Sequence, residues 1–163
     1  MKRGFSRPNL SLDFEYDAFI VYFDEDRQWV NNILLPKLES SDFKICVHYR
    51  DFDIGEPIIN NIERYINKSW KIIVVMSNNF ARSEWCQWEV DFVQERRRNQ
   101  GKDSLVLIMY DQIDSYHMTS PIRILLNTAP YITYKEGFGE NLFWKAVING
   151  VRKPTYLRPT AML

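Results

Sequence analysis

Short apolar runs alternate with amphipathic segments along most of this chain. The runs are rich in β-branched and aromatic residues, which is typical of strands, and they span residues 16–22, 43–47, 72–76, 105–109 and 131–134. Residues 72–76 read Ile-Ile-Val-Val-Met and are apolar at every position. That composition predicts a central strand of a parallel sheet, buried on both faces.

Between these runs, apolar residues recur at helical spacing. Pro57 suits the first turn of a helix, Ser77 and Ser83 are candidate N-caps, and Gly101 suits a helix end. Residues 111–129 fit either one long loop or a short helix around 122–126. The stripes expected to face the sheet are Trp29, Val30, Ile33, Leu34 and Leu38; Ile59, Ile62 and Ile66; Trp85, Phe92 and Val93; and Leu142, Trp144 (or Phe143) and Ile148.

Alternation of strands and helices predicts an α/β fold with a parallel sheet and helices on both faces. Right-handed crossovers leave few topologies, and we expect a flavodoxin-like three-layer fold with a five-stranded parallel sheet in the order 2-1-3-4-5. The length of 163 residues fits one domain. We expect a flexible leader at 1–15, the folded domain at 16–150 and a flexible tail at 151–163.

The amino-acid composition argues against several classes of function. Lys plus Arg and Asp plus Glu both number 21, and this balance argues against a general nucleic-acid binder. Two cysteines, Cys46 and Cys86, are too few for a disulfide scaffold and favour a reduced, intracellular setting. The apolar runs fall far short of the ~20 residues that a membrane helix needs, so we expect any span to lie outside this sequence.

The residues that would be needed for the sites often found in such folds are absent from this sequence. No glycine follows the first strand, and Gly137-Phe138-Gly139 is the only G-x-G, which excludes a dinucleotide or P-loop site. Asp24 and Asp26 could form the acidic pair of a phosphoryl receiver, but no carboxylate follows the third strand; we interpret them as helix N-terminal acids. The two histidines, His48 and His117, and the two cysteines are too widely spaced for a metal site.

Four strings, in order, resemble the signatures of TIR domains. Residues 16–22 resemble the first signature, residues 50–55 (Arg-Asp-Phe-Asp-Ile-Gly) the second, and Phe143-Trp144 the third. Residues 83–92 are similar to a segment of Toll-like receptors. The match covers nearly the whole folded region, and the chain most resembles the cytoplasmic TIR domain of a Toll-like receptor, followed by the adaptors of that pathway.

The resemblance implies an innate-immune signalling module without a cofactor. Such domains bind TIR domains of the same receptor and of myeloid-differentiation-type adaptors, and they form homo-oligomers on activation. It also implies a place on the cytoplasmic side of a single-pass membrane receptor.

The family's main contact element corresponds to the loop at residues 50–56. Charges of both signs surround two apolar side chains there, which are the ingredients of a binding patch; the alternative is purely local pairing and packing. Relatives commonly carry proline before the loop glycine, whereas Ile54 makes this tip more apolar. The residues expected to bind partners are Arg50, Asp51, Phe52, Asp53, Ile54, Gly55 and Glu56.

Three other motifs have a structural and a functional interpretation. We expect Phe143-Trp144 to pack the last helix onto the sheet rather than to form a contact site. We expect Cys86 to be a small buried residue rather than a redox sensor. The run Arg96-Arg97-Arg98 is expected to be a solvated helix end, with charge-steered assembly or lipid contact as the alternative.

An enzymatic alternative rests on Glu89. Some TIR domains cleave NAD with a glutamate four residues after a tryptophan, and Trp85 and Glu89 match that spacing. Aromatic neighbours would raise the pKa of this carboxyl, and the carboxylate could stabilise charge as a glycosidic bond breaks. The scaffold interpretation is favoured, with NAD glycohydrolysis as the alternative.

Overall fold

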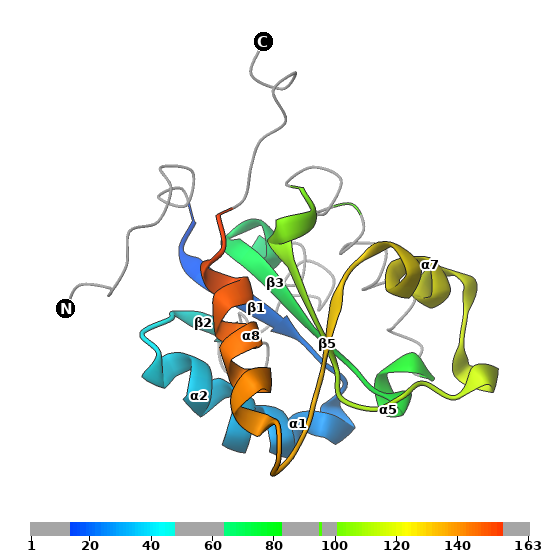
Figure 1. The fold of residues 1–163 in the computed structure, drawn as a ribbon. Coiled ribbons are helices and arrows are strands. Elements are labelled where there is room, and N and C mark those ends of the chain that lie inside the picture. The colour runs from blue at the N-terminus through cyan, green and yellow to red at the C-terminus, as the bar shows by residue number, and fades with distance from the viewer. Residues whose placement is uncertain (1–13, 48–63, 83–94, 96–100, 155–163) are drawn as a thin grey trace.

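A computed structural model describes residues 14–47, 64–82, 95 and 101–154. Five parallel strands form one sheet in the order β2-β1-β3-β4-β5 (Figure 1). The predicted fold class and strand order are therefore confirmed. The strands are β1 (Tyr16–Val21), β2 (Ile45–Val47), β3 (Ser69–Met76), β4 (Leu105–Met109) and β5 (Tyr131–Thr133).

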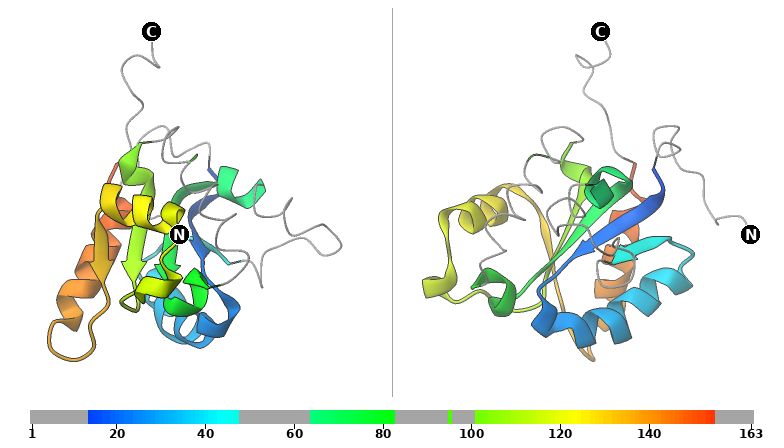
Figure 2. Two further views of the ribbon diagram at one scale, coloured as in Figure 1. Left: turned by 90° about the vertical axis from the view of Figure 1, so that its right-hand side faces the viewer. Right: turned by 180° about the vertical axis from the view of Figure 1, so that it is seen from behind.

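Helical segments connect these strands. After β1 the chain forms a short 3-10 turn, η2 (Asp24–Asp26), then α1 (Arg27–Trp29), a π-helical stretch η3 (Val30–Leu34) and α2 (Leu35–Ser40). Further helical segments in the described part of the chain are α5 (Asn78–Ala81), η4 (Lys102–Ser104), η5 (Ser115–His117), α7 (Ser120–Thr128) and α8 (Glu140–Arg152). Residues 64–67, which precede β3, are also helical. Figure 2 shows the same arrangement from the side and from behind.

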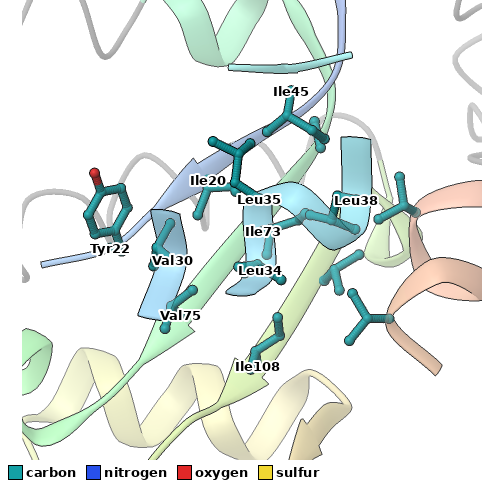
Figure 3. Close-up of a cluster of buried hydrophobic side chains, with 14 of the residues drawn as sticks. Ile20, Tyr22, Val30, Leu34, Leu35, Leu38, Ile45, Ile73, Val75 and Ile108 are labelled. Carbon is teal, nitrogen blue, oxygen red and sulfur yellow. The ribbon is translucent and has the colours of Figure 1, made fainter. Parts of the chain in front are cut away.

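Side chains of each strand alternate between two hydrophobic cores, one on each face of the sheet. Ile20 of β1 and Ile73 of β3 point to the core beneath α1, α2 and α8, which Figure 3 shows. Phe19 and Ile72, their neighbours in sequence, point to the other core, where Phe80 of α5 and Ile122 of α7 pack. Two buried layers of this kind require helices on both faces, as the strand composition predicts.

Every residue of β3 is buried, including two polar ones that a continuous apolar run would not predict. Ser69 Oγ donates a hydrogen bond to the Tyr65 carbonyl at 2.7 Å. Lys71 Nζ donates to the carbonyls of Asp103 at 2.5 Å and Gly150 at 3.0 Å. The amino group of Lys71 therefore ties β3 to the segment before β4 and to the end of α8.

The first helical segment departs from the predicted stripe at Ile33, which is 43% exposed, whereas Leu35 is buried. The Leu35 N–H donates to the Val30 carbonyl, five residues back. Pro36 lacks an N–H, so the Asn32 carbonyl has no α-helical donor and the turn widens. The wider turn rotates Ile33 out of the core.

The last helix also differs from its prediction. Phe143, Trp144, Val147 and Val151 form its buried stripe, while Leu142 is 71% exposed. The helix continues to Arg152, and Val151 in its last turn is buried in the core. The expectation that Leu142 anchors this helix is wrong: the inward face follows the 143–147–151 spacing instead.

The structure also tests the predictions for residues 111–129 and for the N-cap Ser77. Of the two alternatives for residues 111–129, the helix is confirmed, since α7 begins after Thr119, whose hydroxyl oxygen accepts from the Ile122 N–H at 3.4 Å. Ser77 caps α5 as predicted, by accepting from the Phe80 N–H at 3.0 Å. Ile66, the last residue of the expected stripe Ile59, Ile62 and Ile66, is buried as predicted. Ile59, Ile62 and the stripe at 85–93 lie outside the described residues.

We expect Gly139→Ala to lower the free energy of unfolding by roughly 1–2 kcal/mol, measured by urea denaturation. Gly139 is the N-cap of α8 and has φ +96°, a left-handed conformation that strains any residue with a Cβ. Asn149→Ala, at an exposed position of the same helix, is the control and should change stability by less than about 0.5 kcal/mol. Equal stability of the two variants would contradict the assigned conformation.

Candidate functional site

Ligand sites of open parallel sheets lie where the strand order reverses, beyond the carboxyl ends of the strands. In this sheet the reversal falls between β1 and β3. The segments that leave this edge are residues 22–26 after β1, 77–82 after β3 and 110–114 after β4. The candidate site is built from these three segments.

Asp26 is the central side chain of this edge. Its carboxylate is buried and accepts hydrogen bonds from Ser77 Oγ at 2.5 Å and from Asn79 Nδ2 at 2.9 Å. The interpretation of Asp26 as only a helix N-terminal acid is therefore incomplete, because the carboxylate joins the end of β1 to the end of β3. Asp24 is exposed and pairs with Arg27 at 2.6 Å.

A second set of hydrogen bonds joins the ends of β3 and β4 through Asn78. Its backbone N–H donates to Asp111 Oδ2 at 3.1 Å, and its side-chain amide donates to the Gln112 carbonyl at 3.2 Å. Asn78 Oδ1 in turn accepts from the Asp114 N–H at 2.8 Å. Together with the bonds to Asp26, these bonds connect residues 77–82 to the segments on both sides. Residues 77–82 lead into the signature string that begins at residue 83.

An aromatic cluster lies beside this edge. The Trp29 ring contacts Tyr110 and Tyr134, with centroids 4.9 and 5.0 Å away, and stacks on Trp144 at 6.3 Å. Burial, and then the nearby charge of Asp111, raises the pKa of the Tyr110 phenol above its ordinary value. A phenol with a raised pKa stays protonated at neutral pH, so this cluster provides packing and polarity rather than a base.

Phe143 and Trp144 are both buried and pack against each other with centroids 4.8 Å apart. Trp144 also donates its indole N–H to Glu140 Oε2 at 3.2 Å. The packing interpretation of this pair is confirmed, and a contact role would require the helix to leave the sheet.

Chemically, the described part of the edge suits structure better than catalysis. The Asp26 carboxylate is occupied by hydroxyl and amide donors. Among the described residues, no group of three His, Cys, Asp or Glu side chains is placed to hold a metal ion. Within the same residues, no helix combines the length and the hydropathy needed to cross a membrane.

The predicted contact and catalytic residues are not among the residues that the structure describes. The loop at 50–56 and Glu89 are outside the described residues, as are Cys86 and the arginines 96–98.

The hydrogen bond between Asp26 and Ser77 was missed from the sequence, although the predicted strand order could have indicated it. Both residues follow strands that the order 2-1-3 places side by side, so their side chains meet at one edge.

Comparison with known proteins shows which family this chain belongs to. A profile of the TIR domain matches residues 15–120. Toll-like receptor 6 of Bos taurus is 40% identical over 139 residues, and Toll-like receptor 2 of Mus musculus is 38% identical over 138 residues. These matches cover 83% and 81% of this chain but 18% of each receptor, so the chain spans less than a fifth of the length of these relatives.

Solved structures agree with the sequence matches. The TIR domain of the Toll-related receptor TRR-2 from Hydra magnipapillata superposes with a TM-score of 0.70 at 28% identity. That comparison covers 85% of this chain and 99% of the Hydra chain. The family profile matches more than half of the chain, and the chain belongs to the TIR domain family, with Toll-like receptors among its relatives.

Proposed function

We propose that this TIR domain is an innate-immune signalling module that binds other TIR domains. The observation that carries the proposal is the 40% identity to a Toll-like receptor over 83% of the chain. In this proposal the domain lies on the cytoplasmic side of a single-pass receptor whose membrane span is outside these 163 residues. Pairing of two receptor copies would then create the surface that recruits adaptor TIR domains.

The residues proposed to make the contact are those of the 50–56 loop. Arg50, Asp51, Asp53 and Glu56 surround Phe52 and Ile54 in the sequence. An apolar centre within a charged rim is the composition of a protein interface. The loop carries charges of both signs, and the formal net charge of the whole chain is zero. A domain with this charge balance does not repel a second copy and does not need a partner of opposite charge.

The described surface also exposes several large apolar side chains that do not contribute to either core. These side chains are Ile33, Tyr116, Ile124, Tyr131, Phe138 and Leu142. They are distributed singly over several elements, which is ordinary for a protein surface, so they do not identify a second contact surface.

We expect Ile54→Asp to weaken capture of adaptor TIR domains about tenfold or more, because a charge would have to be desolvated at the contact. Pull-down of candidate adaptor TIR domains measures this, and the far-UV circular dichroism spectrum should remain unchanged. Ile124→Asp is the matched control, since Ile124 is an exposed isoleucine on α7. Capture by Ile54→Asp at the wild-type level would remove the loop from the interface.

The scaffold proposal also predicts that the protein leaves NAD intact. Concentrated protein, free or clustered on beads, should release no nicotinamide above the buffer, because association with like domains requires no bond cleavage. The alternative rests on the spacing of Trp85 and Glu89 alone. Nicotinamide release that disappears in Glu89→Ala would establish the hydrolase in its place.

A further inference from the structure

A small, mostly apolar groove lies where β4 and β5 begin and α8 ends. Its walls include Leu105, Val106, Pro130, Tyr131, Gly150 and Lys153. The volume of the groove is about 170 Å³. A cavity of roughly 150 Å³ with apolar walls accommodates a benzene ring, so the groove has room for one aromatic side chain.

An offset between two neighbouring strands creates this groove. Tyr131, the first residue of β5, lies opposite Leu107 of β4. In the described sheet, the first two residues of β4 therefore have a strand beside them only on the β3 side, where Leu105 pairs with Ile72. Pro130 lies on the side where β5 would continue, and it forms part of the wall of the groove.

The proline at position 130 explains why β5 begins no earlier. At the other end of this strand pair, the Tyr134 N–H donates to the Met109 carbonyl at 2.9 Å. A parallel ladder repeats every two residues, so the donor to the Leu105 carbonyl would be residue 130. Pro130 has no N–H to donate. The groove thus combines apolar walls with a carbonyl to which β5 offers no hydrogen bond.

The end of α8 forms the third side of the groove. Gly150 packs closely on β4, since a Cβ at this position would lie 3.3 Å from Val106 Cγ2. The buried amino group of Lys71 donates to the carbonyls of Asp103 and Gly150, which holds the end of the helix beside the start of β4. The groove is therefore already formed, and an occupant would not need to move α8.

The chain leaves α8 at the wall of this groove. Lys153 lines the groove and is the C-cap of the helix, with an extended backbone at φ −60° and ψ 131°. Pro154 favours this extended conformation in the residue before it. Residues 155–157 read Thr-Tyr-Leu and lie outside the described residues. Three residues span at most about 11 Å, so Tyr156 is within reach of the groove.

We propose that the side chain of Tyr156 occupies the β4–β5–α8 groove of its own chain. Its ring fits the volume and the apolar walls, and its hydroxyl can donate to an acceptor such as the Leu105 carbonyl. Tyr156 is also the only aromatic residue that follows α8 in this sequence. In place of the flexible tail expected at 151–163, residues 155–157 then have a docking site. The proposal concerns contacts within one chain and does not depend on the 50–56 loop.

The short link between Lys153 and Tyr156 favours the chain's own ring over that of a second copy. A short flexible link gives an effective concentration on the order of 1 mM. At that concentration, an intrinsic dissociation constant of about 0.1 mM leaves the ring undocked only about a tenth of the time. A second copy would have to reach a similar concentration in solution to compete.

The test is the rate at which chymotrypsin cleaves after Tyr156, followed by mass spectrometry of the whole chain. A docked ring is inaccessible to the protease, so cleavage follows the undocked fraction. Wild type should be cleaved at least tenfold more slowly than a free synthetic peptide of residues 154–163, at a rate constant that does not change with protein concentration. Tyr131→Glu places a charge on the exposed wall of the groove and should raise the rate at least fivefold.

Tyr116→Glu is the matched control, because it places the same charge at an exposed tyrosine on η5, and it should be cleaved like wild type. Cleavage after the buried Phe143 reports unfolding and should stay at the wild-type rate in both variants. Two results would overturn the proposal: wild type cleaved as fast as the free peptide, or Tyr131→Glu cleaved as slowly as wild type. A rate constant that falls as protein concentration rises would also overturn it, because a second copy would then supply the occupant.

Discussion

Burial of β3 on both faces is the constraint on which the rest of this domain depends. A strand enclosed by two cores has no water for its polar groups, so each must find a partner within the protein. Ser69, Lys71 and Ser77 meet this requirement with the Tyr65 carbonyl, with the carbonyls of Asp103 and Gly150, and with the Asp26 carboxylate. These bonds also connect the sheet to the segments around it at both edges.

Much of the fold could be predicted from the sequence because burial leaves a pattern that needs no knowledge of tertiary contacts. The apolar runs of β3 and β4 and the alternation of strands with helices predicted a parallel sheet, and right-handed crossovers left a few strand orders, of which the flavodoxin-like order was expected. Ile33 and Leu142 were misplaced for local reasons: Pro36 widens the first helical segment, and the inward face of α8 follows Phe143, Val147 and Val151. Lys71 was missed because a lysine is ordinarily exposed, and its bonds to the Asp103 and Gly150 carbonyls depend on the tertiary structure.

The candidate site was predictable to a smaller extent. Asp26 was recognised as an acid near a helix start, but its bond to Ser77 joins residues 51 positions apart and depends on the strand order. The 50–56 loop and Glu89 were selected by resemblance and composition, and they remain predictions.

The position of Lys71 has a consequence for how the domain unfolds. If α8 detached alone, it would uncover its apolar stripe and also withdraw the Gly150 carbonyl from an amino group enclosed in the sheet. An amino group left without that acceptor adds a large penalty to any partly opened state. The last helix and the sheet should therefore lose their structure in a single cooperative step, and fraying of the C-terminal end should stop at Val151.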